Sequence, residues 1–338
     1  MNRRTYLKST GLLLSSYLLP SFTSSGSGKI ITVTGPIPAE KLGTSLIHEH
    51  VLVDFGGAEN YDPNKWNHEK VIEKMLPYLK ELKSAGCETL FECTPAFLGR
   101  DVLLLKKLSK LSGIRMITNT GFYGAVDNKF FPAFARVLTP EKIADIWIKE
   151  FENGIDGADI KPGFMKISVD SGALSELHKK LVKAAALTHL KTGLTIASHT
   201  GPALPAFQEI ELLKESGVHP SAFVWVHAQS EPDKSKYIKA ANEGAWISLD
   251  GLSDDNVQEY SAMISNLKNA GLLSKVLVSH DAGYYDPGKE DGGPIRRYTT
   301  LFDKLVPELK KSGFSRGNLD QLLRRNPAEA FTIRIRRI

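Results

Sequence analysis

Apolar and β-branched residues gather in eight short runs along this chain. The runs cover residues 45–54, 88–94, 115–120, 163–169, 194–199, 222–228, 245–249 and 275–281. Their length and composition are those of buried β-strands. Longer stretches between them repeat apolar positions as on one face of a helix, for example residues 68–85, 140–153, 174–192 and 255–270. Strands that alternate with helices pair in parallel, so the pattern predicts an α/β protein with a parallel sheet.

Eight strand–helix repeats fit a (β/α)8 TIM barrel, which needs about 250 residues plus insertions. A doubly wound open sheet is the alternative. No Gly-x-Gly-x-x-Gly opens the first strand–helix turn, which weakens the nucleotide-binding form of that alternative. No linker divides the body, so we expect one barrel domain over residues 29–338. The long segments 54–67 and 121–139 follow strand ends, where barrel enzymes build their active sites.

The net charge of +5 does not indicate a nucleic-acid partner. Six of the basic residues lie in the two terminal segments: Arg3, Arg4, Lys8, Arg334, Arg336 and Arg337. The body between them is nearly neutral. We therefore expect no binding of nucleic acid.

The first 28 residues resemble an export signal. A twin arginine, Arg3-Arg4, precedes an apolar run over residues 11–19, and a Ser/Gly-rich stretch follows up to Gly28. This order is typical of a twin-arginine (Tat) signal, with a disordered basic N-terminus as the alternative. A membrane-spanning helix needs about 20 apolar residues, so we expect no stable membrane anchor. The mature protein is expected in the periplasm or otherwise outside the cytoplasm.

His48-Glu49-His50 is the strongest local signal for chemistry. Side chains at positions i and i+2 of a strand share a face, so the two imidazoles can hold one metal ion. Glu49 is then expected to face the helices in a structural role.

Four further strand ends carry groups of the same kind: Lys166, His199, His227 and Asp281. In a parallel barrel all these positions meet at one rim. Buried polar groups at the ends of apolar strands are costly unless they are paired or ligated. Six of them together favour a metal centre over unrelated hydrogen-bonded rim residues. His280 should point away from the rim in a supporting or structural role.

This ordered set resembles the amidohydrolase superfamily, and specifically its phosphotriesterase-related family. Three shorter stretches are similar to that family as well: Gly99-Arg100-Asp101, Thr120-Gly121-Phe122-Tyr123 and Asn326-Pro327-Ala328. The likeness runs from about residue 31 to about residue 331. It implies a (β/α)8 barrel with two divalent metal ions at the C-terminal ends of its strands.

The resemblance also implies the ligands. They are His48, His50 and Asp281 for the more buried ion, and His199 and His227 for the more exposed one. Lys166 would bridge the two ions as an N6-carboxylated lysine, because a free ammonium has only donors and cannot bind a cation. A buried ion pair between Lys166 and Glu92 is the alternative. Zinc is the expected metal, although manganese, cobalt or iron suit the same ligands.

Such a centre predicts hydrolysis of an ester. Metal coordination lowers the pKa of water from about 15.7 towards about 7, so hydroxide exists at neutral pH. A bridging hydroxide would attack a carbonyl or phosphoryl centre, and Asp281 would pass on its proton. Asp281 and Lys166 are therefore the predicted catalytic residues.

Tyr123, Tyr284 and Arg296 follow strand ends and are the candidate substrate contacts. A tyrosine can orient a carbonyl oxygen, and an arginine can bind a carboxylate or phosphate. Arg296 at the solvated start of the last helix is an equally simple interpretation. The resemblance favours a small-molecule lactone or other carboxylic ester, a sugar lactone included, with phosphotriester hydrolysis as a second activity.

Two other functions remain open. One is a non-catalytic binding protein that retains metal, which the complete set of six residues argues against. The other is a mononuclear, deaminase-like member of the superfamily that does without the bridging lysine. A homodimer is compatible with the sequence.

Overall fold

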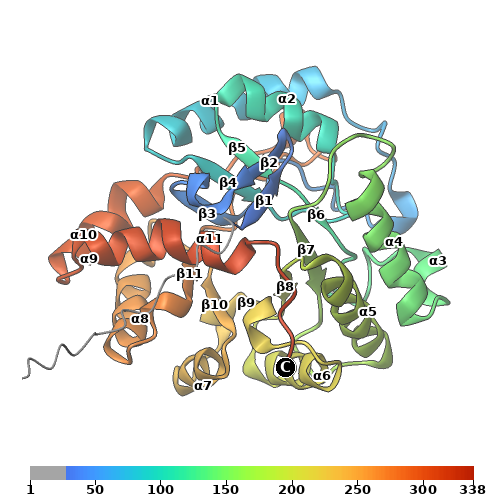
Figure 1. The fold of residues 1–338 in the computed structure, drawn as a ribbon. Helices are drawn as coiled ribbons and strands as arrows, with labels where there is room; N and C mark the ends of the chain where they lie inside the picture. The colour runs from blue at the N-terminus through green and yellow to red at the C-terminus, as the bar shows by residue number, and fades with distance from the viewer. Residues whose placement is uncertain (1–27) are drawn as a thin grey trace, which may run out of the picture.

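The computed structural model describes residues 28–338 and has eight parallel strands closed into a barrel (Figure 1). In chain order they are β3 (Ser45–Glu49), β4 (Thr89–Glu92), β5 (Arg115–Ile117) with its continuation β6 (Asn119–Thr120), β7 (Phe164–Ser168), β8 (Ile196–His199), β9 (Phe223–Val226), β10 (Trp246–Leu249) and β11 (Val276–Val278). The predicted export signal lies outside the described residues. Within the described part of the chain, no helix is long and apolar enough to cross a membrane.

The first and last strands close the ring. Parallel pairing joins β6 through to β11, and β3 through β4 to β5. The amide of Asp281 donates to the carbonyl of His48 over 3.0 Å, and the amide of His50 donates to the carbonyl of Ala282 over 2.9 Å. These bonds place the segment after β11 beside β3. Residues from the two ends of the chain therefore meet at one rim.

Helices surround the strands (Figure 1). They are α1 (His68–Ser84), α2 (Val102–Ser112), α3 (Ala133–Arg136), α4 (Pro140–Asn153), α5 (Glu176–Thr192), α6 (Ala203–Glu215), α7 (Ser235–Glu243), α8 (Val257–Asn269), α9 (Val306–Lys311), α10 (Arg316–Asp320) and α11 (Asn326–Phe331). The four amphipathic stretches expected from periodicity correspond to α1, α4, α5 and α8. Strand–helix alternation was therefore predicted correctly over most of the chain.

Local sequence explains where α2 begins and ends. The Asp101 carboxylate caps the helix by accepting from the amide of Leu104 over 2.9 Å. Gly113 ends it at a φ of 72°, a left-handed conformation that glycine adopts without strain. The helix thus begins after the loop that follows β4 and returns the chain to β5.

An antiparallel hairpin, β1 (Lys29–Thr32) and β2 (Gly35–Pro38), was not expected. The amide of Val33 donates to the carbonyl of Met116 in β5. Ile30 of the hairpin and Phe331 of α11 are buried with Phe91 and Phe164 in the barrel interior. The hairpin and α11 therefore cover the end of the barrel where the strands begin.

Apolar side chains fill the barrel itself. The inward-facing residues include Ile47, Phe91, Ile117, Phe164, Ala197, Val224, Trp246 and Leu277. The interior is a packed core and not a channel, as in other barrels of this kind. Polar side chains that point inward have room only above this core, at the C-terminal ends of the strands.

Candidate metal centre

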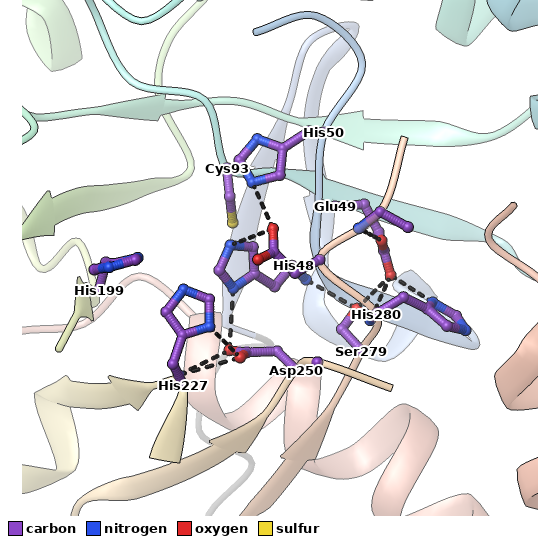
Figure 2. A network of polar contacts seen from close by, with 12 residues as sticks. His48, Glu49, His50, Cys93, His199, His227, Asp250, Ser279 and His280 are labelled. Carbon is purple, nitrogen blue, oxygen red and sulfur yellow. Dashed lines mark hydrogen bonds and ion pairs between the residues drawn. The ribbon is translucent and has the colours of Figure 1, made fainter. Parts of the chain in front are cut away.

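The six ligand-type residues line one small cavity at the C-terminal ends of five strands, and Figure 2 shows the four histidines among them. The cavity has a volume of about 130 Å³. Its walls are His48, His50, Val53, Phe55, Leu98, Tyr123, Lys166, His199, His227, Asp281 and Tyr284. Because a water molecule takes up about 30 Å³ in the liquid, this space suits ions and a few waters.

Backbone irregularities turn three of these side chains into the cavity. The pairing of β3 with β4 shifts register between Leu46 and Glu49, so His48 joins the site although Ile47 already faces the barrel interior. His227 and Asp281 have φ angles of 60° and 54°. A left-handed conformation costs a non-glycine residue about 1 kcal/mol or more, and such residues concentrate at functional sites.

His48 is fully buried and held from both sides. Its Nδ1 lies 3.0 Å from an oxygen of Asp250, and its Nε2 lies 3.1 Å from the Lys166 Nζ. Burial and the neighbouring Lys166 lower the pKa of His48 to about 4, although Asp250 acts in the opposite direction. At neutral pH the ring is uncharged, so Nδ1–H donates to Asp250 and the Nε2 lone pair faces the cavity.

His50 is fixed in the same tautomer by a chain of hydrogen bonds. Its Nδ1 lies 2.8 Å from the Thr94 hydroxyl, and that hydroxyl donates its proton to Glu92. His50 must therefore donate through Nδ1. Its Nε2 then faces the Asp281 carboxylate at 3.0 Å.

Glu92 is the last acceptor in this series of hydrogen bonds, and it does not pair with Lys166. Its carboxylate accepts from the Thr94 hydroxyl and from the amides of Thr94 and Val51. Burial raises its pKa. Among the described residues no ion pair joins Glu92 to Lys166, so the structure does not support the alternative role for that lysine.

Asp250 was missed by sequence reasoning, and it organises the other half of the site. It is buried at the end of β10, and one of its oxygens lies 2.7 Å from the Nδ1 of His227 while the other lies 3.0 Å from the Nδ1 of His48 (Figure 2). Burial alone would raise the pKa of Asp250, but His227 and His48 outweigh it and hold the pKa well below its usual range. A single carboxylate therefore aims two imidazole Nε2 atoms at the cavity.

His199 completes the ring of imidazoles. Its ring centroid lies 4.3 Å from that of His227, and its Nδ1 lies 3.0 Å from the Tyr123 hydroxyl. Burial and the charge of the neighbouring His227 lower the pKa of His199 well below its usual value. The ring is neutral at physiological pH and can act as a ligand.

Asp281 lies between these groups as an ionised carboxylate. Burial would raise its pKa, but His48 and His50 hold the pKa far below its ordinary value. The Tyr284 hydroxyl donates to Asp281, and the Tyr284 ring stacks on His50 at 4.9 Å. Burial and the adjacent Asp281 raise the pKa of Tyr284, so this phenol remains a donor across the working pH range.

The donor set fits metal ions. Two groups of side chains have donor atoms near enough to share an ion: His48, His50 and Asp281, and His48, His227 and Asp250. The Nε2 of His50 lies 3.0 Å from a carboxylate oxygen of Asp281, so one cation between the two atoms, either a proton or a metal ion, is shared by both. The two groups are consistent with a binuclear centre. The oxygens of Asp250 already accept from two Nδ1 atoms, so Asp250 orients the histidines and the Nε2 atoms remain for ligation.

Glu49 faces away from the cavity and supports the loop after β11 (Figure 2). One of its oxygens accepts from the Ser279 hydroxyl and from the Nδ1 of His280, and the other accepts from the amide of Ala282. The Nε2 of His280 in turn accepts from the amide of Leu301. Both residues fix the segment that carries Asp281.

Arg296 lies at the surface of the same loop. Its guanidinium donates to the carbonyl of Asp281 over 2.8 Å, and a second, longer contact reaches the carbonyl of His280. It is not part of the wall of the small cavity. Its role as a substrate contact stays a prediction, whereas Tyr123 and Tyr284 do line the cavity.

A parallel (β/α)8 barrel that gathers histidines, a lysine and an aspartate at its C-terminal rim is the architecture of the amidohydrolase superfamily of metal-dependent hydrolases. The chain belongs to the phosphotriesterase family, whose model matches residues 28–331. A phosphotriesterase homology protein of Escherichia coli (strain K12) is 28% identical over 294 residues, which cover 86% of this chain and 98% of that protein. A phospho-furanose lactonase of Mycoplasmopsis synoviae (strain 53) is 29% identical over 321 residues, covering 88% of this chain and 89% of the other.

The fold has a close counterpart among solved structures. The phosphotriesterase from Mycobacterium tuberculosis superimposes with a TM-score of 0.81 at 25% sequence identity, covering 90% of this chain and 98% of that one. The correspondence extends over nearly the whole barrel.

Proposed function

We propose that the protein is a binuclear metal-dependent hydrolase that opens lactones or cleaves other neutral carboxylic esters. The observation that supports this proposal is the composition of the wall of the small cavity. Two phenol hydroxyls, from Tyr123 and Tyr284, lie beside the ligand-type groups, and the remaining wall is apolar. With His199 donating from its Nδ1, the Tyr123 hydroxyl keeps its proton for a carbonyl oxygen, and the apolar residues suit the rest of a neutral ester.

The apolar side of the cavity also favours a neutral substrate. Val53, Leu98 and Phe130 form a buried apolar cluster against which Tyr123 and Tyr284 pack. Lys166 is the one basic side chain of the wall apart from the histidines, within the part of the chain that the structure describes. A phosphate, sulfonate or carboxylate on the substrate would therefore lack a dedicated cationic partner here. This favours a lactone with an alkyl or aryl substituent over a phosphorylated sugar lactone.

The ligand-type residues have separate roles in the proposed reaction. His48, His50 and Asp281 would hold one divalent ion, His199 and His227 the other, and carboxylated Lys166 both. Bound ions of this kind polarise a carbonyl oxygen and make water a nucleophile at neutral pH. Asp281, whose carboxylate lines the cavity, would accept the proton of the attacking water and pass it to the leaving oxygen. Tyr284 donates to Asp281 and so fixes the carboxylate in position.

Phosphotriester hydrolysis is the second candidate. Membership in the phosphotriesterase family supports it, and the same arrangement can stabilise charge on a phosphoryl oxygen. A neutral phosphotriester also needs no cationic partner in the wall. The two substrates can be separated only by their rates.

The test measures metal content and hydrolysis together in the wild type and in Lys166→Ala. We expect about two metal ions per wild-type chain and at least about 100-fold lower kcat/KM in the variant, with metal lost in parallel. Lys179→Ala, which removes an exposed lysine paired with Glu176, is the matched control and should retain both properties. The substrates are alkyl-substituted γ- and δ-lactones, a sugar lactone, and diethyl 4-nitrophenyl phosphate.

The outcomes distinguish the candidate functions. A larger kcat/KM for lactones than for the phosphate supports the proposal, and the reverse order makes the second candidate the main activity. One ion per chain with full activity in Lys166→Ala would indicate a mononuclear enzyme. Metal-loaded protein that turns over none of these substrates would favour the binding protein.

A further inference from the structure

The small cavity at the metal centre reaches solvent beside Phe55. This residue keeps 45% of its surface exposed, whereas every other residue of the cavity wall is buried or half-buried. The Asp281 carboxylate, with 26% of its side chain exposed, is also partly open to solvent. A group that extends from the metal centre out of the cavity therefore passes Phe55.

Aromatic rings form a continuous wall from the metal centre to this point. The Tyr284 ring stacks on His50 with the centroids 4.9 Å apart, and the Phe55 ring lies 6.3 Å from that of Tyr284 at an interplanar angle of 35°. Ring centroids about 4.5–7 Å apart are typical of aromatic side chains in contact. The exposed part of Phe55 is the outer end of this wall.

The volume of the cavity limits what fits inside it. About 130 Å³ corresponds to about four water molecules in the liquid. Two metal ions and the reacting ester group fill such a space. A substituent of several carbons must therefore lie outside it, against the exposed part of Phe55.

Phe55 is held in a fixed position by its neighbour Asp54. The amide of Asp54 donates to the carbonyl of Leu98 over 2.8 Å. The buried carboxylate of Asp54 accepts from the amide of Gly56 over 2.9 Å and from the ammonium group of Lys65 over 3.0 Å. A contact residue on a fixed backbone loses little conformational freedom when a ligand binds, which strengthens binding.

The polar groups near this point disfavour a charged substituent. The Asp281 carboxylate would repel an anion, and the Lys65 ammonium group is already paired with Asp54. Apolar atoms that cover the Phe55 ring gain binding free energy instead. We propose that Phe55 is the specificity-determining residue that binds the apolar substituent of the substrate. This assignment deepens the proposed function and rests on it for the ester that is cleaved.

The test compares two hydroxamates that chelate the metal ions and differ only in the length of their chain. Acetohydroxamate has a single methyl group, and octanohydroxamate has a chain of seven carbons. Isothermal titration calorimetry of the zinc-loaded protein measures both dissociation constants, and their ratio gives the preference for the longer chain. Because a buried CH₂ group strengthens binding by up to about fourfold, we expect the wild type to prefer octanohydroxamate by at least about tenfold.

Phe55→Ala should lower this preference at least fivefold. Phe55→Leu, which keeps an apolar side chain, should retain most of it. Phe134→Ala is the matched control, because Phe134 is likewise a phenylalanine with 49% of its surface exposed and does not line the small cavity. This control should keep the preference of the wild type.

Three results would overturn the assignment. They are a wild-type preference near one, an unchanged preference in Phe55→Ala, and an equal loss of preference in Phe134→Ala. Zinc-loaded protein that binds neither hydroxamate would overturn it together with the proposed function. Binding is read from heat and not from turnover. A preference that depends on Phe55 in a protein that hydrolyses no ester would therefore support the contact and refute only the proposed activity.

Discussion

Asp250 holds two histidines by their Nδ1 atoms with one carboxylate. Its oxygens also accept from the Ser248 hydroxyl and from the side chain of Gln229. Every lone pair that could serve a metal ion is thus already engaged. The residue acts on the metals through the orientation of His48 and His227.

Asp250→Asn should weaken metal binding by about 10- to 100-fold. An asparagine has one acceptor oxygen where the aspartate has two, so one of the two histidines loses its partner and its fixed tautomer. Metal affinity is measured by competition with a chromogenic chelator. Asp233→Asn, the same substitution at an exposed residue that bonds to Ser235, should leave the affinity unchanged. Equal affinities of Asp250→Asn and the wild type would assign Asp250 a purely structural role.

There is a physical reason why three residues of the site could be predicted from the sequence and Asp250 could not. His48, Lys166 and His227 interrupt apolar strands with groups that are costly to bury, so their position alone signals a site. Asp250 follows an apolar strand too, but a lone aspartate after a strand is also common in turns. Its contact with His48 at β3 spans 202 positions of the sequence, and only the closed barrel brings these two residues together. For the same reason the sequence could not show that Arg296 bonds to backbone carbonyls.

At the scale of elements, the end of β6 approaches β7 as closely as the backbone allows. Gly121 has a φ of 135°, and a Cβ at this position would lie 2.0 Å from the carbonyl oxygen of Lys166. Gly121→Ala should therefore destabilise the protein by about 3 kcal/mol or more, through strain at this φ and overpacking. Urea unfolding measures the change.

Gly172→Ala is the matched control for this prediction. A Cβ at Gly172 would have no atom within 4 Å, and its φ is an ordinary one. We expect a change within about 0.5 kcal/mol there. A loss of stability in Gly121→Ala as small as the one expected for Gly172→Ala would show that the close approach of β6 to β7 is not rigid.

Glu209 of α6 supports the end of β8 from behind. It is buried and accepts from the hydroxyls of Ser198 and Thr200, which flank His199. Burial raises its pKa to about 8, although both hydroxyls oppose the rise. The carboxyl group is therefore neutral in the folded protein at pH values where it is ionised in the unfolded chain.

The raised pKa of Glu209 predicts a pH dependence of stability. The folded state binds one more proton than the unfolded state between about pH 4.5 and 8, so the contribution of this group is complete below that range and is lost as the pH rises through it. We expect the stability of Glu209→Gln relative to wild type to increase from pH 5 to pH 8, by at least about 1 kcal/mol, because the amide does not ionise. Urea unfolding of both metal-free proteins at several pH values measures this. A constant difference would show that Glu209 is ionised in the fold.

Strand and helix boundaries were predictable to within a few residues, and irregular elements were not. The runs that predicted β7 and β8 contain the observed strands, because a buried parallel strand is apolar on both faces. The register shift in β3 leaves no trace in the sequence, since it depends on the pairing with β4. The β1–β2 hairpin was missed because its few apolar residues are buried only by contact with the barrel end.

At the scale of the whole molecule, the ligand-type residues connect five strands, and the first and the last strand of the barrel are among them. His48 lies in β3 and Asp281 lies after β11. An ion bound by both residues therefore also stabilises the contact between the first and the last strand of the barrel. Because an unfolded chain cannot present these residues together, metal binding adds directly to the free energy of unfolding. At a free metal concentration 100 times the Kd, each site adds about 2.7 kcal/mol.

Removal of the metal with a chelator should therefore lower the melting temperature by on the order of 5 °C, and added zinc should restore it. Differential scanning calorimetry with and without the chelator measures the shift. Asp281→Ala, which lacks one ligand of the more buried ion, should show a markedly smaller shift. Leu204→Trp, whose side chain lies outside the small cavity, should show the full one. An equal shift in Asp281→Ala and the wild type would mean that the stabilising ion binds elsewhere on the barrel. Metal binding at the rim would then not stabilise the contact between the first and the last strand.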